Sequence, residues 1–80
     1  MKKILVVDDE PSIVTLLTFN LEKEGYQVVS ASDGQKAFDL ALSKPFDFII
    51  LDVMLPNLDG IEITKKLRQE KIETPILVLT

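Results

Sequence analysis

The chain has 80 residues, a formal net charge of −4 and no cysteine, which allows one small domain and suits a reducing cytoplasm. Its 46% hydrophobic and 28% charged residues are typical of a folded chain and not of a disordered one. The negative charge argues against direct nucleic-acid binding, and no apolar run is long enough for a signal peptide or a membrane span.

Four short apolar runs divide the chain, and we expect each of them to form a strand. They are residues 4–7, 26–31, 48–51 and 76–79. The first, third and fourth runs are continuous and rich in branched residues, as strands buried on both faces are. The second run is interrupted by Gln27 and Ser30, which favours a position at the edge of the sheet.

A first helix is expected between the first two runs. Pro11 suits its first turn, and Gly25 suits the position just past its end. Helical spacing places four apolar side chains in one stripe that we expect to face the core: Ile13, Leu16, Leu17 and Leu21.

A second helix is expected to start near Ser32. Ser32 and Gln35 have the spacing of a capping box, while Asp33 precedes a glycine and has the context of a turn or cap residue. The apolar face of this helix would consist of Ala37, Phe38, Ala41 and Leu42.

A third helix is expected to start at Asp59, whose side chain can accept hydrogen bonds from the first turn. Ile63 and Leu67 would then point inward, with help from Ile61. Strands that alternate with helices in this order imply parallel pairing through right-handed crossovers, with helices on both faces. The sequence therefore predicts an open α/β parallel sheet.

Polar residues follow three of the four expected strands. Asp8 and Asp9 follow the first strand, Asp52 follows the third, and Thr80 follows the fourth. In open α/β sheets the ligand crevice lies outside the carboxyl ends of the strands. If the first and third strands are neighbours, the three aspartates converge in that crevice.

Convergent carboxylates repel each other, by on the order of 4 kcal/mol for a pair about 4 Å apart at an effective dielectric near 20. Either one of them holds a proton or a cation neutralises the group. Because the chain has no His and no Cys, the site is all oxygen, which favours a hard ion such as Mg²⁺. Mg²⁺ beside a carboxylate suggests phosphoryl chemistry, with one of the aspartates as nucleophile and the metal neutralising charge on the transferring group. Thr80 could then donate its hydroxyl to a phosphoryl oxygen.

Purely structural explanations stay open for each residue taken alone. Acids before a helix, here Asp8, Asp9 and Glu10, commonly cap it and interact favourably with its dipole. Asp52 alone could be a turn residue, and Thr80 alone could be an ordinary strand end. The observation that favours a site is that these residues all lie at the ends of strands.

Three segments of the sequence closely resemble the receiver domain of bacterial two-component response regulators. They are "KILVVDDEPSI", "FDFIILDVMLPNLDGIEITKKLR" and "TPILVLT". The likeness covers all 80 residues and is strongest to receivers that precede a winged-helix DNA-binding domain. It implies a flavodoxin-like fold with strand order 2-1-3-4.

The resemblance also implies a role for each site residue. Asp52 would be the phosphoacceptor, taking a phosphoryl group from the phosphohistidine of a sensor histidine kinase. Mg²⁺ would be held by Asp8, Asp9, Asp52 and the backbone carbonyl of Met54. Thr80 would be the switch hydroxyl that turns toward a phosphoryl oxygen.

Pro56 and Gly60 would shape the loop that presents this site. The resemblance implies a cytoplasmic phosphoacceptor and not an enzyme, with at most self-phosphorylation from small donors and autodephosphorylation. Its signal would control an output domain, a transcription domain, that these 80 residues do not include.

Family receivers continue with a fourth helix, a fifth strand that ends in a lysine, and a fifth helix. We therefore expect residues 1–80 to be a partial receiver domain with no second domain. An alternative is a fragment that acts only as an interaction or oligomerisation module through the exposed edge of strand 76–79. A phosphatase with an aspartate nucleophile is a third option, but such enzymes need Asp-x-Asp where this chain has the adjacent pair Asp8-Asp9.

Overall fold

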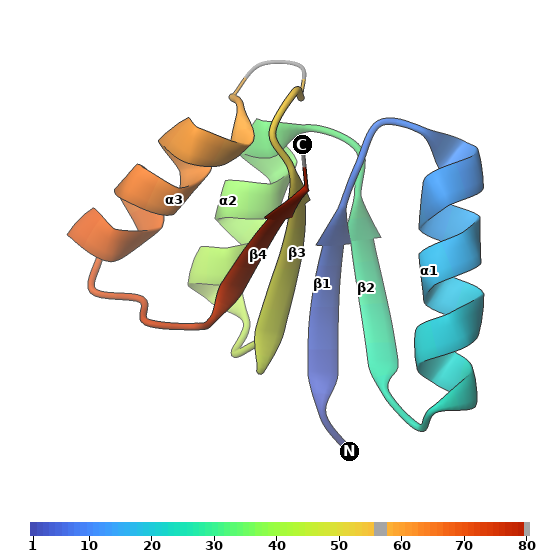
Figure 1. The fold of residues 1–80 in the computed structure, drawn as a ribbon. Coiled ribbons are helices and arrows are strands. Elements are labelled where there is room, and N and C mark those ends of the chain that lie inside the picture. Colours follow the sequence, from blue (N-terminus) through green and yellow to red (C-terminus); the bar gives the residue numbers. More distant parts are fainter. Residues whose placement is uncertain (56–57, 80) are drawn as a thin grey trace.

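The computed structural model describes residues 1–55 and 58–79, which form a four-stranded parallel sheet with helices on both faces (Figure 1). Its elements are β1 (Lys3–Val7), α1 (Pro11–Lys23), β2 (Gln27–Ala31), α2 (Gly34–Ser43), β3 (Phe48–Asp52), α3 (Gly60–Gln69) and β4 (Ile76–Leu79). The strand order is β2-β1-β3-β4, and every neighbouring pair is parallel. The flavodoxin-like arrangement and the edge position of strand β2 are therefore confirmed.

Side-chain alternation along the central strands divides the core into two clusters. Leu5 and Val7 of β1 face α2 and α3, whereas Ile4 and Val6 face α1. Figure 1 shows α2 and α3 together on one face of the sheet and α1 alone on the other. The buried cluster on the α2 and α3 face contains Leu5, Val7, Ala31, Ala37, Ala41, Phe46, Ile49, Leu51, Ile63 and Leu67. The cluster on the α1 face contains Ile4, Val6 and Ile50.

Helix α1 begins and ends where the sequence predicts, but half of its expected core stripe is exposed. Leu17 and Leu21 pack against the smaller cluster. Ile13 and Leu16 are 38% and 58% exposed, so their predicted burial is wrong. The physical reason is that α1 packs mainly on β1 and β2, and within the stripe it is Leu17 and Leu21 that reach the core between them.

The ends of α1 follow local chemistry. Pro11 is its first residue, where a missing N–H costs no helical hydrogen bond. Gly25 has a φ of 94°, a left-handed conformation that favours glycine, and its N–H donates to the carbonyl of Glu22. Both positions were predicted from the sequence.

Helix α2 is capped by Asp33 and not by the predicted Ser32. The Asp33 Oδ1 atom accepts the backbone N–H of Lys36 at 2.8 Å, so the helix begins at Gly34. Gln35, the expected partner in the capping box, instead donates its side-chain N–H to Asp39 Oδ1 at 3.1 Å. A cap can be supplied by either of two adjacent polar residues, and the tertiary path of the chain selects the second.

Helix α3 begins as predicted, because Asp59 Oδ1 accepts the backbone N–H of Glu62 at 2.9 Å. Ile63 and Leu67 are buried on the sheet. Ile61 is 53% exposed, so the expectation that it helps to fill the core is wrong. None of the helices in the described part of the chain has the length and apolar run that a bilayer span requires.

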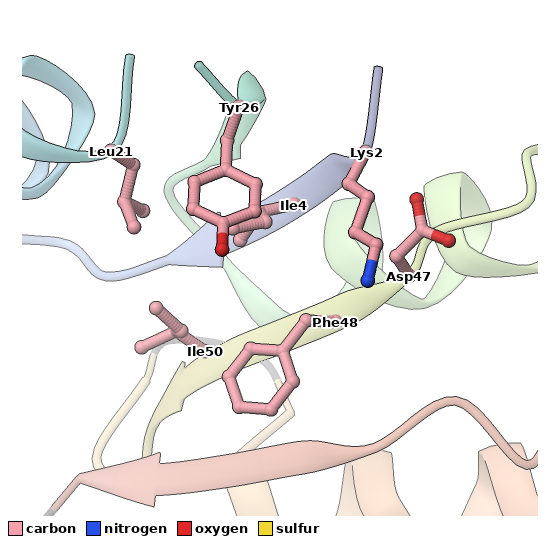
Figure 2. A pocket seen from close by; sticks show the side chains of 7 residues that line it. All are labelled: Lys2, Ile4, Leu21, Tyr26, Asp47, Phe48 and Ile50. Atoms are coloured by element: carbon pink, nitrogen blue, oxygen red, sulfur yellow. The ribbon is translucent and has the colours of Figure 1, made fainter. Parts of the chain in front are cut away.

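The sheet is less completely covered on the α1 face. A cavity of about 350 Å³ lies there, near the amino ends of the strands, and Figure 2 shows the side chains around it. It is lined by Lys2, Ile4, Leu21, Tyr26, Asp47, Phe48 and Ile50. At the neighbouring sheet edge, Leu77 of β4 is 48% exposed. Apolar surface of the sheet therefore stays open on this side.

A pair of matched substitutions in α3 tests the observed burial. Ile63→Val removes one buried methylene and is expected to lower the free energy of unfolding by about 1 kcal/mol. Ile61→Val makes the same chemical change on an exposed side chain and is expected to change it by less than about 0.5 kcal/mol. Urea denaturation followed by circular dichroism measures both, and equal losses would contradict the assigned faces of α3.

Candidate metal and phosphoryl site

Parallel pairing brings three carboxylates together at one end of the sheet. Val7 of β1 lies opposite Leu51 of β3, so the residues that follow, Asp8 and Asp52, emerge side by side. Asp8, Asp9 and Asp52 each offer one carboxylate oxygen, and these three oxygens lie within 4.8 Å of one another. The structure thus brings together Asp8, Asp9 and Asp52, as we expected from their positions at the ends of the strands.

Backbone hydrogen bonds orient two of the three carboxylates. Asp8 Oδ1 accepts the N–H of Glu10 at 2.9 Å, and Asp52 Oδ1 accepts the N–H of Met54 at 3.2 Å. Asp8 is 7% exposed, and its own N–H donates to the carbonyl of Ala31 at the end of β2. Both side chains are therefore held by the turns that follow their strands.

The helix-capping explanation accounts for only part of this acidic segment. Glu10 occupies the position before α1, but its side chain accepts no hydrogen bond from the first turn. The first-turn N–H groups of Ile13 and Val14 donate to the backbone carbonyl of Glu10. Asp9 is exposed, and one of its carboxylate oxygens belongs to the acid cluster. The acids are consequently better explained by their convergence than by the helix alone.

Three carboxylates this close repel one another. Two negative unit charges about 4.8 Å apart repel each other by about 1 kcal/mol in bulk water and by about 3.5 kcal/mol at an effective dielectric near 20. A bound divalent cation removes this cost. The donor set fits a hard ion such as Mg²⁺, because the ligands are carboxylate oxygens and the chain has no His or Cys.

Two clefts border the acid cluster, and Asp9 lines both. The first has a volume of about 470 Å³ and is lined by Asp9, Val53, Met54, Leu55 and Asp59. The second has a volume of about 330 Å³ and is lined by Asp8, Asp9, Pro11, Val14, Thr15, Ser30, Ala31, Ser32 and Lys36. Sequence reasoning did not single out Lys36, since a lysine on a helix surface carries no local signal of a site.

The loop between β3 and α3 forms one wall of the first cleft. Met54 lines this cleft with a side chain that is 79% exposed, and its backbone lies next to Asp52 through the hydrogen bond described above. Gly60 closes the loop, because its N–H donates to the carbonyl of Val53 at 3.0 Å. The two other residues predicted to act here, Pro56 and Thr80, lie outside the described residues.

Removal of one acid tests both the repulsion and the cation. Without metal, Asp52→Asn is expected to raise the free energy of unfolding by about 1 kcal/mol, because it removes one charge while the amide oxygen can still accept the Met54 N–H. Mg²⁺ at 100 times its dissociation constant is expected to stabilise the unmodified chain by about 2.7 kcal/mol and the variant by much less.

Asp47→Asn is the matched control for this measurement. Asp47 precedes the other end of β3, and its Oδ2 also accepts a backbone N–H, that of Lys3 at 2.8 Å. Thermal and urea melts with EDTA and with Mg²⁺ should show no gain in stability for this variant and the full response to Mg²⁺. An equal response to Mg²⁺ in both variants would contradict a cation at the acid cluster.

Comparison of the chain with known proteins identifies its family. The family model described as "Response regulator receiver domain" matches residues 4–80. Among curated proteins, the chain is 63% identical over 79 residues to the alkaline phosphatase synthesis transcriptional regulatory protein PhoP of Bacillus subtilis (strain 168). That match covers 99% of this chain and 33% of PhoP, so the chain spans about a third of the length of this relative.

Solved structures agree with the family assignment. The response regulator protein TrrA of Thermotoga maritima, solved in complex with Mg²⁺ and BeF, superposes with a TM-score of 0.94 at 41% identity, covering 100% of this chain and 70% of TrrA. TrrA in complex with the histidine kinase ThkA gives a TM-score of 0.91 at 41% identity, with 100% and 69% covered. The match to the family model and the three aspartates gathered at the strand ends together show that the chain belongs to the response regulator receiver domain family.

Proposed function

We propose that this chain is a phosphorelay receiver that accepts a phosphoryl group on Asp52 from the phosphohistidine of a sensor histidine kinase. The observation that carries the proposal is the set of three carboxylate oxygens within 4.8 Å at the carboxyl ends of β1 and β3. Membership of the receiver family and the likeness to TrrA, which was solved with a histidine kinase, support it.

The proposed reaction forms one bond and breaks one. A carboxylate oxygen of Asp52 attacks phosphorus, and the phosphorus–nitrogen bond of the phosphohistidine breaks, with the electron pair leaving on the imidazole nitrogen. Attack by Oδ2 would keep the hydrogen bond between Oδ1 and the Met54 N–H, which holds the carboxylate in one orientation. Asp52 is partly exposed, and Asp9 beside it lines both clefts, so the donor would have access to the cluster.

Asp8, Asp9, Asp52 and the backbone carbonyl of Met54 would hold Mg²⁺ in this proposal. When bound, the ion would neutralise the carboxylates and the negative charge on the transferring phosphoryl group. The fit of an all-oxygen donor set supports this choice, as does the solution of TrrA with Mg²⁺ and BeF. Thr80 would donate its hydroxyl to a phosphoryl oxygen.

The biological setting belongs to the same proposal. We place the chain in the cytoplasm, as a phosphoacceptor and not an enzyme, with at most self-phosphorylation from small donors and autodephosphorylation. Its output would be transcriptional, through a domain outside these 80 residues. The 63% identity to PhoP, which is named as a transcriptional regulatory protein, supports this output.

Intact-mass spectrometry tests the phosphoacceptor directly. The chain incubated with acetyl phosphate and Mg²⁺ is expected to gain one phosphoryl group, and EDTA is expected to abolish the gain. Asp52→Asn should gain none, whereas the control Asp47→Asn should react as the unmodified chain does. No adduct on the folded, Mg²⁺-bound chain, or an adduct that survives in Asp52→Asn, would refute the proposal.

A second candidate function is self-association through the edge of β4. It is favoured by one observation: β4 ends the sheet, and Leu77 on it is 48% exposed. An unpaired, apolar edge strand is a template for pairing with another chain. In this function the acid cluster would not be used.

Sedimentation velocity at several concentrations distinguishes the two functions. If the edge associates, the unmodified chain should form dimers or larger species, and Leu77→Lys should return it to a monomer because it charges the edge. Ile61→Lys is the control, because Ile61 is 53% exposed on α3 and away from the edge. A monomer at all concentrations would exclude the second function.

A further inference from the structure

We infer that Gly34, the first residue of α2, is a positioning residue for the acid cluster, through contact with the loop between β3 and α3. This inference rests on the proposed binding of Mg²⁺ at Asp8, Asp9 and Asp52. Gly34 is not among the residues that line either cleft, and it precedes Asp52 by a whole helix and strand. Its effect on the site is therefore indirect.

The contact is one that no other amino acid could make. A Cβ atom built on Gly34 would lie 2.6 Å from the carbonyl carbon of Leu58 and 2.7 Å from its Cβ, and closer still to its carbonyl oxygen. Real Cβ contacts essentially never fall below 3.0 Å. Because two of the three atoms belong to the backbone of Leu58, a change of side-chain rotamer cannot relieve the overlap.

Conformational freedom does not explain the glycine. Of the glycines, only Gly25 has a φ in the left-handed region, so the backbone of Gly34 is one that alanine adopts without strain. Alanine also has the higher helix propensity. The requirement at position 34 is consequently one of space, set by the approach of Leu58 to the start of α2.

Leu58 is connected to Asp52 through Gly60, which lies two residues after Leu58 and contacts the end of β3. Leu58 is half-buried against the larger core cluster, and two residues later Gly60 donates its N–H to the carbonyl of Val53. A Cβ atom on Gly60 would lie 2.8 Å from the carbonyl oxygen of Asp52, so the loop also rests on the phosphoacceptor's backbone.

Two glycines thus allow close backbone contacts at the end of the loop that leads into α3. Gly34 lets it approach α2, and Gly60 lets it approach the end of β3. Displacement of Leu58 by a methyl group at position 34 would shift Gly60 and its hydrogen-bond partner Val53. Val53 is followed by Met54, whose N–H orients the Asp52 carboxylate. The three carboxylate oxygens would then lose the mutual spacing that binds the cation.

Gly34→Ala tests the inference against Gly25→Ala. Both variants add one methyl group to a glycine, and both are expected to lower stability. At Gly25 the cause is backbone strain, and no atom lies within 4 Å of the added Cβ. Isothermal titration calorimetry with Mg²⁺ is expected to show a dissociation constant weakened about 10-fold or more in Gly34→Ala, and unchanged in Gly25→Ala.

A second readout does not depend on the metal. In nitrogen–proton correlation spectra without Mg²⁺, Gly34→Ala is expected to shift the amide signals of Val53, Met54 and Gly60, and Gly25→Ala to leave them in place. If the unmodified chain binds no Mg²⁺, the proposed function fails, while these shifts still report whether Gly34 positions the loop.

The unmodified chain and both variants are measured in trimethylamine N-oxide, which stabilises the folded state, so that destabilised variants stay folded. Unshifted signals together with unchanged Mg²⁺ affinity in Gly34→Ala would overturn the inference. So would a Gly34→Ala chain that stays unfolded where Gly25→Ala folds, because Gly34 would then be required by the fold as a whole and not by the site.

Discussion

The parallel pairing of β1 with β3 is the constraint on which the rest of the site depends. Asp8 and Asp52 are 44 positions apart in the sequence, and they become neighbours because Val7 lies opposite Leu51 at the ends of their strands. A slip of one residue in this register would turn the side chains of one strand to the opposite faces of the sheet. Both the core and the acid cluster therefore depend on the same register.

The acids oppose folding, and the residues directly before them compensate. Val7 and Leu51, which precede Asp8 and Asp52, are 1% and 0% exposed, and both belong to the larger core cluster. The carboxylates that repel each other thus follow directly on fully buried core residues. This placement keeps the charged oxygens at a fixed spacing, which is the condition for binding a cation tightly.

The two faces of the sheet differ in what they contribute. The face covered by α2 and α3 contains most of the buried core, and it also holds the loop that borders the acids, through Gly34 against Leu58 and Gly60 against Asp52. The face covered by α1 has a small core and the open cavity near the amino ends of the strands (Figure 2). The α2 and α3 side consequently holds the loop beside Asp52, whereas the turn before α1 orients Asp8.

The sequence by itself determined the elements, their order and the acids at the strand ends. Branched apolar runs, Pro11, Gly25 and the Asp59 cap are local signals, and local chemistry decided them correctly. The family likeness, which the comparisons confirm, gave the strand order and the roles proposed for Asp52 and its neighbours.

Only the tertiary structure decided which of several equivalent local choices is used. Ser32 and Asp33 are both good caps, and the path of the chain selects Asp33. Ile13 and Leu16 have core spacing, but of this stripe Leu17 and Leu21 reach the smaller core cluster and Ile13 and Leu16 stay exposed. Gly34 carries no local signal of a site, because its role depends on the approach of Leu58, a residue from a distant loop. Periodicity and capping are properties of neighbours in sequence, whereas the width of a packed face and the space beside a backbone exist only after folding.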